Sequence, residues 1–126
     1  MSSDYETIAQ RAIAAWNAND WESLEAMVAS DVVAVGPREW PETGSRNGWP
    51  EVRDQFERLK DPWETERFDV VRIDDTASGA LLEGRWIGTG TGSGLDLDMP
   101  MWIRFEVAEG LISRMQFFLS EDQAAE

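Results

Sequence analysis

Residues Leu95–Leu119 have the sequence LDLDMPMWIRFEVAEGLISRMQFFL, in which two apolar-rich runs flank the pair Glu109-Gly110. An acidic residue followed by Gly between two such runs is typical of a tight β-hairpin turn. The segment therefore predicts two long antiparallel strands. Both faces of this hairpin carry many apolar side chains, so we expect both to be covered. One face is predicted to line a small-molecule pocket, and the other to pack against a second subunit.

A two-residue turn also predicts which residues lie opposite each other. Counting back from the turn pairs Arg104 with Met115 and Trp102 with Phe117. Paired residues on neighbouring strands share a face, because side chains alternate along each strand. We therefore expect these four side chains to lie together on the pocket face.

The rest of the chain predicts an α+β fold. Its 126 residues are enough for one core, and we expect residues 1–126 to form a single domain. Apolar positions such as Ile8, Ala12 and Trp16 recur at helical spacing, which predicts a helix with one side facing a core. The pattern as a whole predicts three N-terminal helices packed on one side of a curved antiparallel or mixed sheet. The expected helices cover residues 5–17, 21–30 and 49–60, with caps at Asp20 and Asn47, and the expected strands cover 32–35, 66–74, 80–89, 96–107 and 111–119. Residues 36–48 are expected to form a loop, and residues 120–126 a single helical turn.

Composition argues against several classes of function. The net charge is −14, from 25 acidic and 11 basic residues, and such a surface repels nucleic acid and anionic membranes. The chain has no Cys and no His, so neither a zinc site nor any other metal or cofactor is expected. With no signal-peptide pattern and no long apolar run, we expect a cytoplasmic protein. Acid–base chemistry would need a carboxylate, Tyr5 or Lys60.

Charged residues inside the apolar strands are the candidates for polar contacts in the pocket. Parity along the strands places Glu83 on the same face as Arg104, so the two can form an ion pair. One interpretation is a structural pair at the rim of the sheet. The other is a functional Arg104 that orients a carboxylate or oxyanion of the ligand. Glu83 and Asp98, and after them Glu106, are the candidate catalytic carboxylates.

Seven Trp residues are a large number for this length, and they favour either a heavily aromatic core or an aromatic box for a flat ligand. Trp40 and Trp49 also allow a third reading, in which an exposed aromatic loop binds a partner. The predicted ligand-binding set combines the aromatic candidates with the hairpin face and consists of Trp16, Phe56, Trp102, Arg104, Met115 and Phe117.

Four segments resemble nuclear transport factor 2-like proteins of the SnoaL-like type, and together they span nearly the whole chain. They are residues 14–33 (AAWNANDWESLEAMVASDVV), 46–56 (RNGWPEVRDQF), 109–112 (EGLI) and 117–124 (FFLSEDQA). The resemblance implies a cone-shaped fold in which a curved sheet wraps a long helix and leaves an apolar pocket. It also implies a dimer formed through the outer face of the sheet. It does not imply one activity, because the superfamily contains both enzymes and non-catalytic binders.

The active sites of the characterised relatives do not carry over to this chain. The resemblance to ketosteroid isomerase places its general base at Gly36, its oxyanion Tyr at Ala12 and its protonated Asp at Trp102. The catalytic Asp of the epoxide hydrolase relatives falls at Phe117. Scytalone dehydratase and the SnoaL-type polyketide cyclases use His, which this chain lacks.

The sequence therefore predicts a binding protein with an apolar, aromatic-lined pocket for a small, flat molecule that is neutral or anionic. Two alternatives stay open at this stage. One is a lyase or isomerase that uses a pocket carboxylate, and the other is a non-catalytic dimeric interaction domain.

Overall fold

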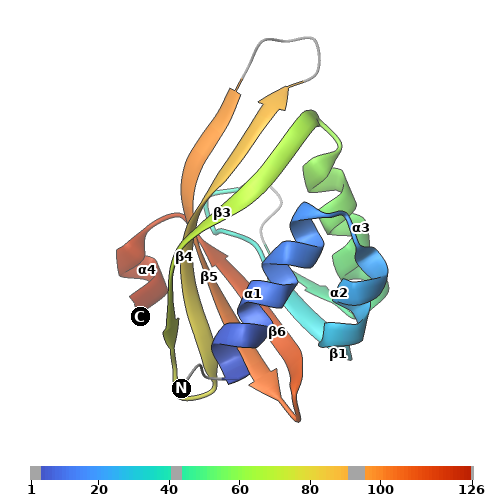
Figure 1. Ribbon diagram of the computed structural model, residues 1–126, viewed down its shortest axis with the longest axis vertical. Coiled ribbons are helices and arrows are strands. Elements are labelled where there is room, and N and C mark those ends of the chain that lie inside the picture. The colour runs from blue at the N-terminus through green and yellow to red at the C-terminus, as the bar shows by residue number, and fades with distance from the viewer. Residues whose placement is uncertain (1–3, 41–43, 91–95, 126) are drawn as a thin grey trace.

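The computed structural model describes residues 4–40, 44–90 and 96–125 as four helices and six strands (Figure 1). The helices are α1 (Asp4–Asn17), α2 (Trp21–Met27), α3 (Trp49–Lys60) and α4 (Glu121–Ala125). The strands are β1 (Val28–Val35), β2 (Ser45–Asn47), β3 (Trp63–Asp75), β4 (Gly79–Gly90), β5 (Asp96–Ala108) and β6 (Leu111–Phe118). Leu95, the first residue of the hairpin segment, lies outside the described residues.

All six strands form one sheet in the order β2-β1-β6-β5-β4-β3. β1 runs parallel to β6 and every other neighbouring pair is antiparallel, so the sheet is mixed. Helices α1, α2 and α3 lie on one side of the sheet and α4 lies on the other (Figure 1). The predicted α+β class is confirmed, whereas the cone shape stays a prediction. Within the described ranges, no helix is both long and apolar enough to cross a bilayer.

The second helix ends earlier, and the first strand begins earlier, than predicted. α2 ends at Met27 and β1 begins at Val28, although Ser30 and Asp31 are exposed polar residues that are typical of a turn. Val28 pairs with Ile112 of β6, and the register then shifts before Val33, so the polar residues sit in an irregular part of the strand. β2 lies inside the predicted loop, because a strand of three residues is too short to show an alternating pattern.

One of the two predicted helix caps is confirmed. The Asp20 carboxylate accepts hydrogen bonds from the Ser23 hydroxyl (2.6 Å) and the Ser23 backbone N–H (3.1 Å), as expected for an N-cap. The hydroxyl contact, followed by the backbone contact, holds the pKa of Asp20 below its usual value. The predicted cap at Asn47 is wrong, because Asn47 belongs to β2 and the N-cap of α3 is Gly48, which has a positive φ of 88°.

The hairpin turn lies where it was predicted, but the pairing beyond it is displaced by one residue. Glu109 and Gly110 both have positive φ (55° and 79°), as a type I′ turn requires. Ser113 is then an extra residue in β6, and its hydroxyl donates to the backbone oxygen of Glu106 at 3.2 Å. Beyond this β-bulge, Arg104 pairs with Gln116 and not with Met115 as predicted.

The bulge decides which side chains of the hairpin face the helices. Phe105 pairs with Met115 and Ile103 pairs with Phe117, and these side chains lie on the helix side of the sheet. Trp102 and Arg104 therefore point to the opposite face, because successive residues of a strand point to opposite faces. Buried and partly buried residues accordingly alternate over residues 101–106 of β5. The predicted grouping of all four hairpin residues on one face is wrong.

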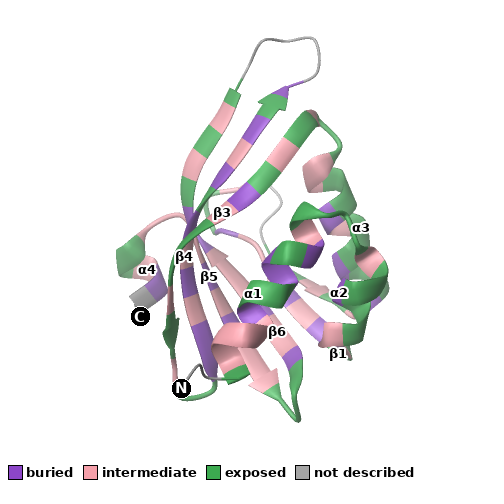
Figure 2. Ribbon diagram, viewed as in Figure 1, coloured by how far each residue is buried: buried purple, intermediate pink, exposed green. Residues whose placement is uncertain are grey.

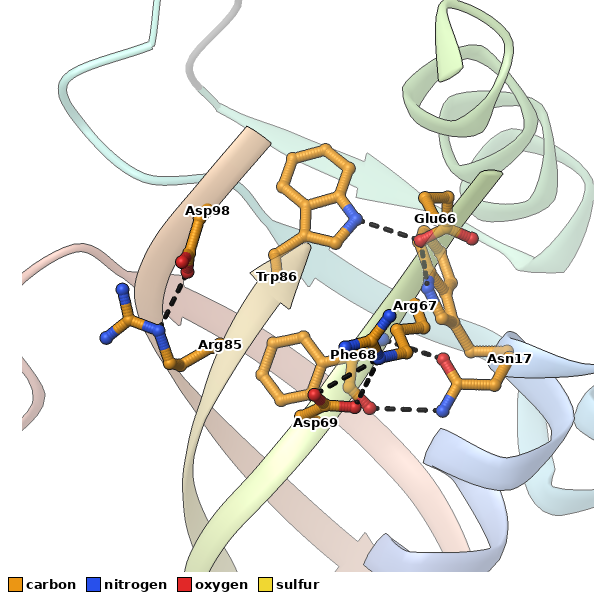
Figure 3. A network of polar contacts seen from close by, with 9 residues as sticks. Asn17, Glu66, Arg67, Phe68, Asp69, Arg85, Trp86 and Asp98 are labelled. Atoms are coloured by element: carbon orange, nitrogen blue, oxygen red, sulfur yellow. Dashed lines mark hydrogen bonds and ion pairs between the residues drawn. The ribbon is translucent and has the colours of Figure 1, made fainter. Parts of the chain in front are cut away.

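The core lies between the helices and the inner face of the sheet (Figure 2). α1 contributes small buried residues such as Ala9 and Ala12, which let the helix axis approach the strands closely. Asn17, the last residue of α1, then fixes this helix to the edge strand β3. Its amide nitrogen donates to the Phe68 backbone oxygen (3.0 Å), and its amide oxygen accepts from the Phe68 backbone N–H (2.7 Å). The side chain thus pairs with β3 as a neighbouring strand would (Figure 3).

A close approach inside the sheet gives the first prediction. Gly84 of β4 lies under the Phe68 ring, and a methyl group there would contact that ring and stand 2.5 Å from the Asp69 backbone oxygen. Gly84→Ala should therefore lower the free energy of unfolding by about 1–3 kcal/mol, measured by urea denaturation. Gly36→Ala is the matched control, since its nearest neighbouring atom is 4.0 Å away at Trp40. Equal stability of the two variants would contradict the assigned packing of Phe68.

Candidate functional site

An apolar hollow lies between the three helices and the inner face of the sheet. The centre of a water-sized molecule can occupy about 80 Å³ of it, which leaves room for several waters or a small organic molecule. Side chains from most of the fold contribute to its wall. The described lining residues are Ala12, Ile13, Trp16, Leu24, Ala34, Gly36, Trp40, Gly44, Arg46, Gln55, Phe56, Leu59, Phe68, Trp86, Met101, Ile103, Phe105, Met115 and Phe117.

Four of the six predicted ligand-binding residues lie on this wall, and the aromatic rings among them contact one another. The four are Trp16, Phe56, Met115 and Phe117. Trp16 of α1 and Phe56 of α3 stand edge to face, with ring centroids 5.1 Å apart at 82°. Phe56 meets Phe117 of β6 at 6.2 Å and 90°. Met115 lies on the same strand as Phe117 and is 3% exposed. Edge-to-face contacts hold aromatic side chains in defined orientations, so this part of the wall is well ordered. The ligand-binding role of these residues stays a prediction.

Trp102 and Arg104, the other two predicted residues, lie outside the hollow. An Arg104 Nη2 nitrogen donates to the backbone oxygen of Ala124, and the guanidinium lies 5.7 Å from the centroid of the Phe118 ring. Arg104 therefore attaches α4 to the outer side of the sheet. The prediction that Trp102 and Arg104 line the pocket is therefore wrong, because the extra residue at Ser113 shifts the pairing of β5 with β6 by one position.

The candidate catalytic carboxylates also lie on the outer face. Glu83 is directly opposite Trp102 on β5 and Arg72 on β3, so it shares the face of Trp102, as predicted, but that face is not the pocket face. Asp98 accepts a hydrogen bond from Arg85 Nε at 2.8 Å in an ion pair whose side chains are about half exposed (Figure 3). Neither carboxylate lines the hollow. Glu106, the third candidate, is 4.0 Å from Arg114 in another half-exposed pair.

The carboxylate that does lie behind the hollow wall is Glu66 of β3. Its Oε2 atom accepts a hydrogen bond from the indole nitrogen of Trp16 at 3.0 Å. The same atom accepts a second from the indole nitrogen of Trp86 at 2.9 Å (Figure 3), and both Trp residues line the hollow. Its Oε1 atom forms an ion pair with Lys60 Nζ. The Glu66 side chain is 6% exposed and the Lys60 side chain 10%. We call these four residues the Glu66 cluster.

Lys60, the only lysine in the sequence, has all its described polar contacts within the Glu66 cluster. Its Nζ atom donates to the Trp16 backbone oxygen (2.7 Å) and lies 4.2 Å from the centroid of the Trp16 ring. Buried charges are tolerated when they are paired and hydrogen-bonded, and both conditions are met here. Glu66 therefore serves to orient two indole rings, and its oxygens are already engaged by three donors.

The sequence carries one signal for this cluster. Glu66 has the same strand parity as Phe68, so it is a charged residue on an otherwise apolar, inward-facing side. A carboxylate at such a position needs a partner, and Lys60 ends the preceding helix. The two indole donors could not be identified in this way, because Trp16 is 50 residues away in the chain.

Two polar side chains line the hollow at its β2 end. Arg46 lies opposite Ala34 in the β1–β2 pairing, and its Nη2 atom is 3.4 Å from the Gln55 Oε1 atom of α3. Both side chains are partly buried. Neither was predicted, because β2 lies within the segment expected to be a loop. Among the described lining residues none is acidic, and across the described ranges no three acidic side chains gather to form a metal site.

The chain belongs to the SnoaL-like domain family, whose sequence profile matches residues 9–115. It is similar in structure to Bal32a from a soil-derived mobile gene cassette, with a TM-score of 0.84, 18% identity and 97% and 93% of the two chains covered. It is also similar to TerC co-crystallized with polyporic acid (0.81, 13%, 96% and 95%). A third similar structure is a hypothetical protein with a ketosteroid isomerase-like fold from Catenulispora acidiphila, in complex with trimethylamine (0.77, 17%, 90% and 85%). These identities are low, so the structures show a shared fold. No curated protein sequence matches the chain.

The family assignment agrees with the resemblance of the four segments, and the apolar positions can now be placed. Ala12, Gly36 and Phe117, three of the positions at which the sequence resemblance suggested catalytic groups, line the hollow. Trp102, the fourth such position, lies on the outer face of the sheet.

The Glu66 cluster gives the second prediction. Glu66→Gln keeps the shape and one acceptor for the indoles but leaves the buried Lys60 ammonium without its counter-charge. The free energy of unfolding should fall by about 3–5 kcal/mol, measured by urea denaturation at pH 7. Glu57→Gln is the control, because it breaks an ion pair with Arg53 whose side chains are 45% and 47% exposed, and it should cost less than about 1 kcal/mol. Similar losses in both variants would show that the cluster is not a buried ion pair.

Proposed function

We propose that this protein binds a small, flat and largely apolar molecule in the hollow. The observation that carries the proposal is the chemistry of the wall. It is made almost entirely of aliphatic and aromatic side chains, with a few polar groups at one end, as is usual for small-molecule sites. Hydrogen bonds to Glu66 hold the indole rings of Trp16 and Trp86 in the wall. These large side chains are therefore kept from turning into the hollow.

The arrangement of rings favours a flat ligand. Trp16 and Phe56 approach from the helices, whereas Phe117 and Trp86 approach from the sheet. A planar molecule can contact rings on both sides by stacked or edge-to-face contacts. Two proteins of similar fold provide a precedent for small-molecule binding, since one was crystallised with polyporic acid and another is in complex with trimethylamine.

The geometry supports binding better than the two alternatives. A lyase or isomerase would need an available carboxylate, but Glu83 and Asp98 are on the outer face and Glu66 already accepts from three donors. An exposed aromatic loop for partner binding is also less well supported. Trp49 is 6% exposed, and Trp40 packs against Trp86 with centroids 6.2 Å apart.

We further propose that a second copy of the chain covers part of the outer face of the sheet. Leu81, Ile87 and Trp102 are partly buried apolar residues of this face. Ion pairs such as Arg85–Asp98 lie beside them and would form the polar rim of such an interface. Sedimentation velocity tests this directly, and a species of 14.2 kDa at micromolar concentration would contradict it.

The binding proposal gives the third prediction. Ala34 is 4% exposed and faces the hollow from β1, so Ala34→Phe should fill the hollow. Native mass spectrometry of the wild-type protein purified from cells should detect a retained small molecule, and Ala34→Phe should lose it while keeping its circular dichroism spectrum.

Val33→Phe is the control, because it places the same phenylalanine side chain at the preceding residue of β1, on the opposite face. This variant should retain the molecule. Retention by Ala34→Phe to the same extent would show that the molecule binds elsewhere. If the wild type carries no molecule and binds no flat aromatic compound in titration, the proposed function is wrong.

A further inference from the structure

The hollow has two chemically different ends. Its floor crosses the sheet from β2 at one edge to β3 at the other, as the order of the lining residues along the sheet shows. Phe68 and Trp86 form the β3–β4 end, where Phe68 is opposite Trp86 in the pairing. Arg46 and Gln55 form the β2 end, beside Ala34. A molecule lying in the hollow therefore meets aromatic rings at one end and polar donors at the other.

Arg46 is the one charged side chain among the described residues of the wall. A guanidinium beside apolar surface is costly unless its donors are used. It has five N–H donors in a planar fork, and its Nη2 atom contacts the Gln55 amide oxygen. The fork matches the two oxygens of a carboxylate, to which it can donate in a bidentate manner.

Lys60, the cation of the Glu66 cluster, cannot take this role. Lys60 is held by Glu66 and by the Trp16 backbone oxygen, behind the rings that line the hollow. The protein as a whole carries a net charge of −14, so its surface offers little general attraction for an acid. Selection of an acidic ligand would therefore depend on a local contact, and Arg46 is placed to provide it.

Gln55 of α3 contacts this guanidinium. Its amide oxygen accepts from Arg46 Nη2, and it projects from α3 one residue before Phe56, a ring of the wall. The distance of 3.4 Å makes this a weak contact, one that can adjust when a ligand oxygen arrives. Gln55 also has amide N–H donors of its own, which can reach the same ligand oxygen.

We propose that Arg46, beside Gln55, binds the carboxylate of the ligand, and that the ligand class is a flat aromatic carboxylic acid. The ring system then lies toward Phe68 and Trp86, and the carboxylate lies at the β2 end. This inference rests on the proposed function and names the ligand class for the same site. It replaces Arg104, which the sequence had suggested for this contact, with an arginine that lines the hollow.

The test compares 2-naphthoate with 2-naphthamide, which have the same ring and nearly the same shape but differ in charge. Isothermal titration calorimetry at pH 7 should show that the wild-type protein binds the acid at least about 10-fold more tightly, as expected for a charge-assisted contact. In Arg46→Met this preference should disappear, while the affinity for the amide stays within about 3-fold of wild type. Arg46→Lys should keep only part of the preference, because it retains the charge and loses the fork.

Arg58→Met is the matched control. It makes the same substitution on α3 at an arginine that is 69% exposed, pairs with Asp54 and does not line the hollow. The change in net charge is identical, so loss of preference in Arg46→Met alone identifies a direct contact. Circular dichroism establishes that each variant is folded. Should Arg46→Met not fold, Arg46→Gln, which also removes the charge, gives the same comparison.

The outcomes separate this inference from the proposed function. Equal affinity of the wild type for the two compounds, or a preference that persists unchanged in Arg46→Met or Arg46→Gln, would overturn the role of Arg46. In either case binding of the amide would still support the hollow as a site for flat molecules. Failure of both compounds to bind the wild type at about 1 mM would instead overturn the proposed function itself.

Discussion

The buried carboxylate of Glu66 connects the parts of the structure that form the hollow. Through Trp16 it reaches α1, through Lys60 the end of α3, and through Trp86 strand β4. Each contact joins an element of the helix layer or the sheet to β3, so the distance between the two layers is held by charged and polar contacts in an apolar setting. Such contacts are directional, and a buried polar group that loses its partner in a region of low dielectric constant destabilises the fold. The aromatic wall consequently has a fixed geometry around a space that it does not fill.

The extra residue at Ser113 is the second feature on which the site depends. A hairpin with an acidic-Gly turn and no bulge would place Arg104 and Trp102 beside the helices. The bulge exchanges the faces of β6 relative to β5, so that Ile103 and Phe105 share the inner face with Phe117 and Met115. The polar and charged residues of the hairpin thereby move to the outer face, and the hollow keeps an apolar floor.

The wall of the hollow is apolar over most of its extent, and Ala12, Gly36 and Phe117 all contribute to it. No described residue of the wall is acidic. The polar contribution comes instead from Arg46 and Gln55, at the edge of the sheet. This distribution, apolar with a few polar groups, is usual for small-molecule sites and supports the proposed binding role.

Local patterns in the sequence were sufficient for the α+β class, the three helices before the meander, the turn at Glu109-Gly110 and the Asp20 cap. These features depend on neighbouring residues, through helical spacing, strand alternation and turn geometry. The face of Trp102 and Arg104, the strand that carries Arg46, and the partners of Glu66 were decided only by folding. A bulge changes register without changing the composition of a strand, and β2 is too short to have a pattern. The contact between Trp16 and Glu66 joins residues 50 positions apart, and such a contact forms only once helix and sheet have packed together.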